Sequence, residues 1–136
     1  MTTLARDKAR PFELGDTAQL PIVADDIVHE GAAVGFDPTT ALARPLQAGD
    51  VFAGFAARRA DNTGGAAGAV KVPTRHEGKI QLPIISLAAS NVGDLVYASD
   101  DDTFTLEASG NSLVGRVDRF VGTGVGVVSY SAGLLA

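Results

Sequence analysis

The chain has 136 residues, enough for one domain with its own hydrophobic core, and its formal net charge at pH 7 is -5. It contains no cysteine, which excludes a disulfide framework and zinc-thiolate chemistry. The basic residues form no stripe interleaved with aromatic residues, so nucleic acid is not an expected partner. No apolar run approaches the roughly 20 residues of a membrane span, and charges occupy the place of a signal peptide's apolar core. We therefore expect a soluble protein, made without secretion and with no membrane partner.

Small side chains dominate the composition. Hydrophobic residues make up 46% of the chain, yet aromatic residues make up only 6%, and there are 16 glycines. Each glycine inside a helix would cost up to about 1 kcal/mol relative to alanine. The composition therefore favours an all-β barrel or sandwich of short strands over a helical bundle.

Residues 1–16 are polar and charged, contain Pro11, and show no sustained apolar period. We interpret them as an N-terminal arm that a partner orders, followed by a single β domain over residues 17–136. A frayed terminus or an expression leader is the alternative interpretation of this segment. The first strand is expected at 19–24, where Pro21 predicts an edge strand.

Turns and apolar strands alternate in the next part of the chain. A turn is predicted at 37–40, because Pro38 fixes φ and Asp37 caps the following backbone amides, and a short strand should lie on each side of it. A second turn at 47–50 leads into an apolar strand at 51–56. In that strand, Gly54 predicts a bulge or the close approach of another backbone.

The segment 61–69 is rich in glycine and alanine without a period, which predicts a long surface loop. A phosphate-binding loop is not expected, since no Gly-Lys-Thr or Gly-Lys-Ser ending and no helix pattern follow. Alternation resumes at 70–72 and again at 80–84, so we expect two strands joined by a hairpin at Glu77-Gly78. One helical turn is predicted between Ser86 and Val92, with Ser86 as its cap.

The last third of the chain, residues 91–128, has the clearest pattern. Four apolar alternating runs are separated by breaks at 100–102, 109–111 and 122–124 that consist of Asp, Ser, Gly, Asn and Thr. A two-residue period with such breaks predicts antiparallel strands with one buried face, connected as a β-meander.

Candidate catalytic groups are few. His29 and His76 are the only histidines, and neither belongs to a nucleophile motif. The acidic triplet at 100–102 lacks the alternating oxygen ligands and the glycine of a calcium loop, so a hairpin turn is the favoured interpretation. We therefore predict no catalytic, metal-binding or cofactor-binding residue, and no enzyme activity. An enzyme remains an alternative only if His29 or His76 joins a carboxylate in a pocket.

A family resemblance covers roughly residues 18 to 130. The chain resembles the capsid decoration (cement) proteins of tailed bacteriophages through the ordered combination of Ala60-Asp61-Asn62-Thr63-Gly64-Gly65, Val70-Lys71-Val72, Asn91-Val92-Gly93-Asp94-Leu95-Val96-Tyr97-Ala98-Ser99-Asp100-Asp101, Val114-Gly115-Arg116-Val117 and Gly124-Val125-Gly126-Val127. The resemblance implies a small β-barrel or β-tulip-like domain of short antiparallel strands, commonly a homotrimer. It also implies binding to the outer surface of the expanded capsid at local threefold positions, where the protein clamps neighbouring major capsid proteins, and it implies no active site or cofactor.

These expectations place the protein on the outer surface of a virion after its synthesis in the host cytoplasm, with the major capsid protein and other copies of itself as partners. The arm is expected to reach a capsid subunit or an adjacent protomer, while the strands at 51–55 and 80–84 contribute to the core. The hypothetical contact residues are Leu4, Arg6, Lys8, Arg10 and Phe12. The alternative function is a receptor- or glycan-binding β-module of a virion or tail, although the chain has no tryptophan and only two tyrosines for an aromatic-lined groove.

Overall fold

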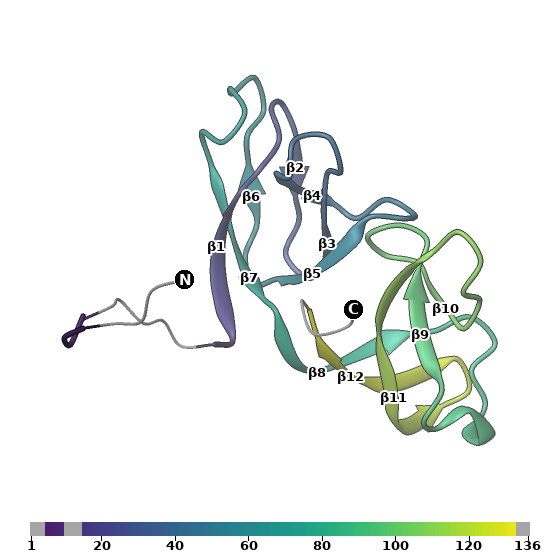
Figure 1. The fold of residues 1–136 in the computed structure, drawn as a ribbon. Helices are drawn as coiled ribbons and strands as arrows, with labels where there is room; N and C mark the ends of the chain where they lie inside the picture. The colour runs from purple at the N-terminus through teal and green to yellow at the C-terminus, as the bar shows by residue number, and fades with distance from the viewer. Residues whose placement is uncertain (1–4, 10–14, 133–136) are drawn as a thin grey trace.

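The computed structural model describes residues 5–9 and 15–132. Nearly all regular structure in this part of the chain is β-strand, arranged in three antiparallel sheets, which confirms the predicted all-β class. Figure 1 shows that the strands divide into two lobes, here called the N-lobe (17–75) and the C-lobe (77–131).

The N-lobe contains a five-stranded sheet in the order β1-β7-β5-β3-β4 and a small two-stranded sheet, β2-β6. Its strands are β1 (Thr17–Pro21), β2 (Ile27–Val28), β3 (Ala33–Phe36), β4 (Ala43–Pro45), β5 (Val51–Ala56), β6 (Ala60–Asp61) and β7 (Lys71–Arg75). β1 is an edge strand, as its proline predicts. The predicted turn between β3 and β4 is confirmed, since the Thr39 amide donates to Asp37 Oδ1 over 2.8 Å.

The C-lobe contains the second five-stranded sheet, in the order β10-β9-β11-β12-β8. Its elements are β8 (Glu77–Pro83), the short 3-10 helix η1 (Ala89–Asn91), β9 (Leu95–Ala98), β10 (Phe104–Thr105), β11 (Ser112–Gly122) and β12 (Val125–Ser131). The helical turn predicted here is present, but Ser86 does not cap it. The residue before the helix is Ala88, whose amide donates to Asn91 Oδ1 over 2.8 Å. The capping side chain is therefore that of Asn91, the last residue of the helix.

The chain passes from one lobe to the other at His76, and the hairpin predicted at Glu77-Gly78 is wrong. β7 pairs with β1 and β5, whereas β8 pairs with β12 in the other sheet. The bend requires close packing at Gly54, because a Cβ there would overlap the Arg75 carbonyl oxygen and lie 2.8 Å from His76 Cα. The prediction of a close backbone approach at Gly54 is therefore confirmed. A bend between two sheets and a hairpin both interrupt a two-residue alternation, so the local pattern could not separate them.

The predicted meander is wrong in its strand order. β11 does not pair with β10, which precedes it, but with the opposite side of β9. Ala98 of β9 therefore has Phe104 as its partner on one side and Ser112 on the other. The strands and their antiparallel directions are as predicted. Because β10 has only two residues, the following loop returns the chain past it to the longer strand β9.

A β-bulge in β5 determines which side chains enter which core. Val34 of β3 pairs with Gly54 and Gly35 pairs with Phe52, which leaves Ala53 as an extra residue. The bulge resets the alternation, so Phe52 and Phe55, three positions apart, face the same core. Ala53 and Ala56 face the other one.

The larger core lies between the lobes. It combines residues of β3 and β5 with residues of β8, β9, β11 and β12, so the two lobes share one packed interior. Leu82 and Ile84 are buried there as predicted, whereas Val51 of β5 is 67% exposed and is an exception to the prediction. The smaller core lies within the N-lobe, between its two sheets.

Candidate functional site

The hypothetical contact residues of the arm are only partly described. Leu4, Arg10 and Phe12 lie outside the described residues. Arg6 and Lys8 are described, and both are exposed. They are accessible to a partner, and their role in contacting one stays a prediction.

The arm joins the body at the junction between the two sheets. The Asp16 carbonyl oxygen accepts a hydrogen bond from the His76 amide over 3.0 Å, immediately before β1 begins at Thr17. β1 then pairs with β7 along its whole length, and its other edge has no neighbouring strand among the described residues. The hydrogen bond of Asp16 therefore places the start of β1 beside His76, the residue at which the chain passes from one lobe to the other.

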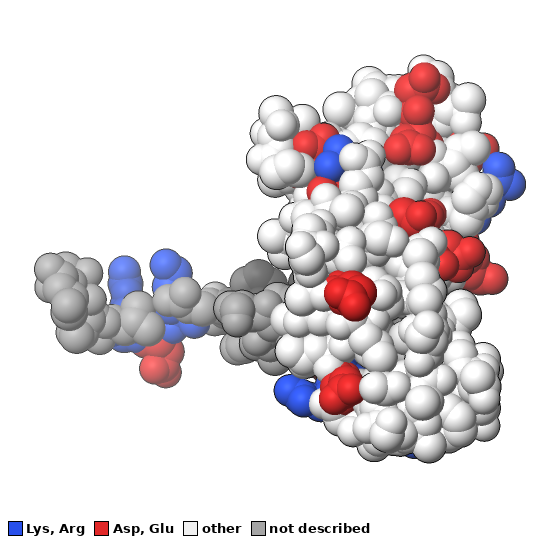
Figure 2. All heavy atoms as spheres, turned by 90° about the vertical axis from the view of Figure 1, so that its right-hand side faces the viewer, with Lys and Arg blue, Asp and Glu red and all other residues white. Residues whose placement is uncertain are grey.

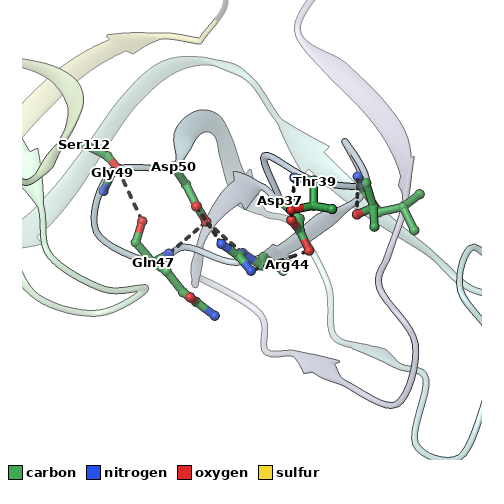
Figure 3. Close-up of polar contacts among 9 residues, drawn as sticks. Asp37, Thr39, Arg44, Gln47, Gly49, Asp50 and Ser112 are labelled. Carbon is green, nitrogen blue, oxygen red and sulfur yellow. Dashed lines mark hydrogen bonds and ion pairs between the residues drawn. The ribbon is translucent and has the colours of Figure 1, made fainter.

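A buried ion-pair network holds the β3-β4 hairpin to the start of β5 (Figure 3). Arg44 donates two hydrogen bonds to the Asp50 carboxylate, at 3.0 Å from Nε and 2.8 Å from Nη2. Asp50 also accepts the Gln47 amide over 3.0 Å, and its side chain is only 3% exposed. The hydrogen bond to Asp50 raises the pKa of Arg44, so the guanidinium stays charged.

Asp37 completes this network from the exposed side. Its carboxylate lies 3.5 Å from Arg44 Nη1. The backbone amide of Thr39 is the main cause that lowers the pKa of Asp37, and the charge of Arg44 lowers it further. No buried side-chain nitrogen or oxygen in the described chain lacks a hydrogen-bond partner, so this cluster stabilises the hairpin through contacts within the chain.

The turn at 47–50 also contacts the C-lobe. The Gly49 amide donates to Ser112 Oγ over 3.1 Å (Figure 3). Gln47 forms an isolated antiparallel β-bridge with Asp100. Ser112 is buried, at 4% exposure. The polar network of the N-lobe thus contacts β11 through Ser112 and the turn after β9 through Asp100.

The acidic triplet forms a turn between β9 and β10, as predicted. Asp100 Oδ1 accepts the Asp102 amide over 2.9 Å, and this bond lowers the pKa of Asp100. Asp101 differs, because burial and then the charges of Asp100 and Asp102 raise its pKa. Its carbonyl accepts the Ala33 amide over 2.9 Å, so the turn packs against the N-lobe.

The two histidines lie apart. His29 and Glu30 line a hollow of about 490 Å³ together with Asp101 and Asp102, while His76 lies at the sheet junction. Within residues 5–9 and 15–132, no group of three His, Cys, Asp or Glu side chains is placed to hold a metal ion. His29 therefore meets the condition set for the enzyme alternative, a histidine beside carboxylates in a hollow, whereas His76 does not. Among the described residues, no hydrogen bond joins either histidine to a serine side chain.

The loop after β6 is more ordered than its composition suggests. Asn62 is 3% exposed, and its Nδ2 donates to the Val23 carbonyl over 2.9 Å and to the Ala66 carbonyl over 3.0 Å. Asp25 adds a bond from the Gly64 amide over 2.7 Å. The prediction of a surface loop holds for most of its residues, but Asn62 anchors it from within.

The sequence did not reveal the network of Arg44 and Asp50 or the anchor at Asn62. The one available signal was the charge at Arg44, placed between apolar residues in a short strand, since a charge there needs a partner. Asp50 was interpreted only as a turn residue. Asn62 belongs to the motif that carries the family resemblance, without an assigned role.

Surface charge and surface apolarity are unevenly distributed. Figure 2 shows one face over which acidic side chains are scattered, while basic ones lie mostly at its margins. Among residues 5–9 and 15–132, the exposed large apolar side chains are Val51, Ile85, Val92, Leu95 and Val121. Four of these five described side chains lie in the C-lobe.

No helix in the described part of the chain has the length and apolarity needed to cross a membrane. Comparison of the sequence and structure with protein-family models, curated proteins and solved structures finds no match.

Proposed function

We propose that this chain is a capsid decoration protein of a tailed bacteriophage. In this role it binds the outer surface of the expanded capsid at local threefold positions as a homotrimer and clamps neighbouring major capsid proteins. The proposal rests on the sequence resemblance and on one structural observation, the attachment of the arm to an edge strand at the junction of the sheets. It assigns no catalytic residue, no metal and no cofactor.

The attachment of the arm supports a clamp for a physical reason. The two lobes share one hydrophobic core, and two hydrogen bonds connect them, from the Gly49 amide to Ser112 Oγ and from the Ala33 amide to the Asp101 carbonyl. These contacts make the body resist deformation. An edge strand can add a strand from another chain through main-chain hydrogen bonds. Three such contacts in one trimer would multiply modest affinities into an avid attachment, by a factor of about 10²–10⁴ for linked sites.

The first experiment mixes the purified protein with expanded capsids that lack it and measures co-sedimentation, together with the mass of the free protein. We expect saturable binding in a simple ratio to the major capsid subunit and particles that survive more heat. Absence of binding by a folded protein would contradict the proposal.

The second experiment tests the arm. Deletion of residues 2–14 and the double substitution Arg6→Glu with Lys8→Glu should each lower capsid occupancy several-fold, more strongly at low salt. The matched control is Arg58→Glu with Lys71→Glu, which makes the same change in net charge at two exposed positions of the body. Equal occupancy for the arm variants and the wild type would remove the arm from the mechanism.

The alternative function, a receptor- or glycan-binding module, is less well supported by the position of the aromatic residues. A sugar-binding groove uses exposed rings, yet four of the seven aromatic rings in the described chain are between 2% and 6% exposed, those of Phe52, Phe55, Phe104 and Tyr130. These four pack on one another in the core with ring centroids 4.9 to 6.0 Å apart. The other three, Phe36, Tyr97 and Phe120, are partly buried. A glycan-array screen separates the alternatives, because a decoration protein should give no specific signal.

A further inference from the structure

One side of β1 carries main-chain groups that no other strand of the described chain pairs with (Figure 1). On its other side, the two pairs that flank the β1-β7 ladder are both hydrogen-bonded. The His76 amide donates to the Asp16 carbonyl over 3.0 Å, and the Ile22 amide donates to the Val70 carbonyl over 3.0 Å. Bonded and non-bonded pairs alternate along an antiparallel ladder, so the even-numbered residues of β1 bond to β7.

The odd-numbered residues of β1 therefore direct their main-chain groups to the open side. Gln19 agrees with this assignment, because it lies opposite Pro73, which has no N–H to donate. Thr17 and Gln19 each present one N–H donor and one C=O acceptor on the open side. Pro21 ends this side, since it has no N–H. The open side can thus form main-chain hydrogen bonds with a short extended segment beside residues 17–20.

The inner face of β1 borders an apolar groove of about 220 Å³. Its walls include Ala18, Leu20, Phe36, Val51, Phe52 and Ala132. Val51 is 67% exposed, although the other residues of β5 are buried. Sites for drug-sized ligands and cofactors measure roughly 300–1,000 Å³ and carry several convergent polar groups. This groove is smaller and mostly apolar, so aliphatic side chains fit it better than a cofactor.

A cation lies on the outer face, next to the open side. Arg75 of β7 lies directly opposite Thr17 in the register of the two strands, and it is exposed. Among the described residues, its side chain forms no ion pair. A strand added beside β1 would lie about 9.6 Å from β7, twice the spacing of neighbouring strands. The long guanidinium side chain can meet a carboxylate across the short side chain of Thr17, which favours an acidic residue there.

β8, the end strand of the other five-stranded sheet, is protected against pairing. It carries Glu77 and Lys79 and ends at Pro83. Charged side chains and prolines are features by which edge strands avoid pairing with other chains. The residues on the open side of β1, Thr17 and Gln19, are uncharged. Of these two end strands, β1 is therefore the one at which a partner strand is expected.

We propose that β1 accepts an extended strand from a protein other than this one, in which the residues opposite 17–20 are acidic, aliphatic, polar and aliphatic in turn. The acidic side chain faces Arg75, and the aliphatic side chains enter the groove. A second copy of this chain is not the expected occupant. On the edge of β8, the residue between Glu77 and Lys79 is Gly78, which has no side chain to enter the groove.

This inference deepens the proposed function and rests on it only for the identity of the partner, because the chemistry of the strand can be tested on the isolated protein. The first measurement is amide hydrogen exchange by NMR. In the free protein, the amides of Thr17 and Gln19 should exchange at least about tenfold faster than those of Ala18 and Leu20, which bond to β7.

The second measurement uses a synthetic probe, the acetylated and amidated peptide Ser-Asp-Val-Thr-Val-Ser, and a control peptide with lysine in place of aspartate. We expect the aspartate peptide to slow exchange at Thr17 and Gln19 and to bind about twofold to fivefold more tightly than the lysine peptide. Arg75→Glu should reverse this preference. The matched control is Arg119→Glu, at an exposed position of the C-lobe, which should retain it. Val51→Asp should weaken both peptides, because it places a charge in the groove.

Several results would overturn the proposal. These are unchanged exchange at Thr17 and Gln19 with millimolar amounts of either peptide, equal affinity for the two peptides, or unchanged affinity in Val51→Asp. Protection of Thr17 and Gln19 in the free protein that rises with protein concentration would show that a second copy pairs with β1, which also overturns it. Failure of the peptide test together with intact capsid binding removes this inference and leaves the proposed function, whereas the opposite pair of results removes the proposed function alone.

Discussion

The two hydrophobic cores of this molecule are built from different residues. The core between the lobes contains the four aromatic rings of Phe52, Phe55, Phe104 and Tyr130, arranged mostly edge to face. The core inside the N-lobe contains no ring among its fully buried members and is made of alanine, valine and isoleucine. Strand β5 contributes to both, with phenylalanines on one face and alanines on the other.

The difference shows how a small-residue lobe is stabilised. Alanines bury little apolar area, and at about 25 cal/mol per Å² they contribute less than aromatic residues. The N-lobe compensates with polar contacts. Four polar residues are buried in the part of the chain that the structure describes, and three of them, Asp50, Asn62 and Thr74, belong to the N-lobe, while Ser112 belongs to the C-lobe. We therefore expect the aromatic core to control global stability and the polar anchors to control the N-lobe.

The largest effect is expected from Phe55→Ala. The ring of Phe55 lies 4.9 Å from that of Tyr130 and 5.3 Å from that of Phe52, so its loss should cost about 3–5 kcal/mol of unfolding free energy. The urea midpoints measured by circular dichroism and by tyrosine fluorescence should shift together, because both lobes share this core. Two separate transitions would show that the lobes fold independently. Val121→Ala, at an exposed position, is the control and should change stability by less than about 0.5 kcal/mol.

The next largest effect is expected from the buried ion pair of Arg44 and Asp50 in the N-lobe. Asp50→Ala leaves the half-buried Arg44 without its main partner, and we expect a loss of about 3 kcal/mol. Lys79→Ala removes the exposed ion pair with Asp118 and should cost no more than about 1 kcal/mol. Adding Arg44→Ala to Asp50→Ala should recover part of the loss in a double-mutant cycle. Similar losses of unfolding free energy for Asp50→Ala and Lys79→Ala would show that the Arg44–Asp50 network does not control the stability of the N-lobe.

A smaller and more local effect is expected at Asn62. Asn62→Ala removes the Asn62 donor from the Val23 carbonyl and one of the two donors from the Ala66 carbonyl, which keeps the Ala69 amide, at a cost of about 1–3 kcal/mol. Amide exchange should accelerate in the loop 61–70 before it does in the C-lobe. Thr63→Ala, in the same loop but exposed, serves as the control. Uniform acceleration across both lobes would contradict a local anchor.

The smallest effect concerns pH. The pKa of Asp101 is raised by burial, and Asp100 and Asp102 add to this while His29 opposes it. The folded state therefore disfavours the charged form, and this penalty is present above the folded pKa and disappears as the pH falls below the ordinary value near 3.8. Asp101→Asn should raise stability by less than about 1 kcal/mol at pH 7, after solvent screening, and by nothing at pH 3. Thermal unfolding at pH 7 and pH 3 measures the difference in stability, with Glu107→Gln as the control. A gain in stability of Asp101→Asn that persists at pH 3 would show that the effect comes from packing rather than from charge.

Much of the local structure could be predicted from the sequence. The turn at Asp37, the edge position of β1 and the close approach at Gly54 depend on the conformational limits of proline, aspartate and glycine, which act within a few residues. The arrangement of strands in space could not be predicted in the same way. A break at Glu77-Gly78 is compatible with a hairpin or with a change of sheet, and only the pairing of β8 with β12 distinguishes them.

In the candidate site, too, local features could be predicted from the sequence, whereas contacts between distant strands could not. The arm and its charged contact residues were predicted from the sequence, and their role stays a prediction. The sequence did not indicate that Asp16 bonds to His76, that Arg44 pairs with Asp50, or that Ala132 lies beside a groove. These contacts join residues from different strands, and their formation depends on the sheet order.

By itself, the sequence determined that this protein is all-β, where most of its turns lie and which residues alternate, because these properties arise from the two-residue period of a strand and from local backbone preferences. The tertiary structure alone decided that the chain changes sheets at His76, that β11 returns to β9, and that a bulge turns two phenylalanines toward one core. The physical reason is that each choice is a competition between strand partners far apart in the chain, and only the packing of both lobes around a shared interior selects among them.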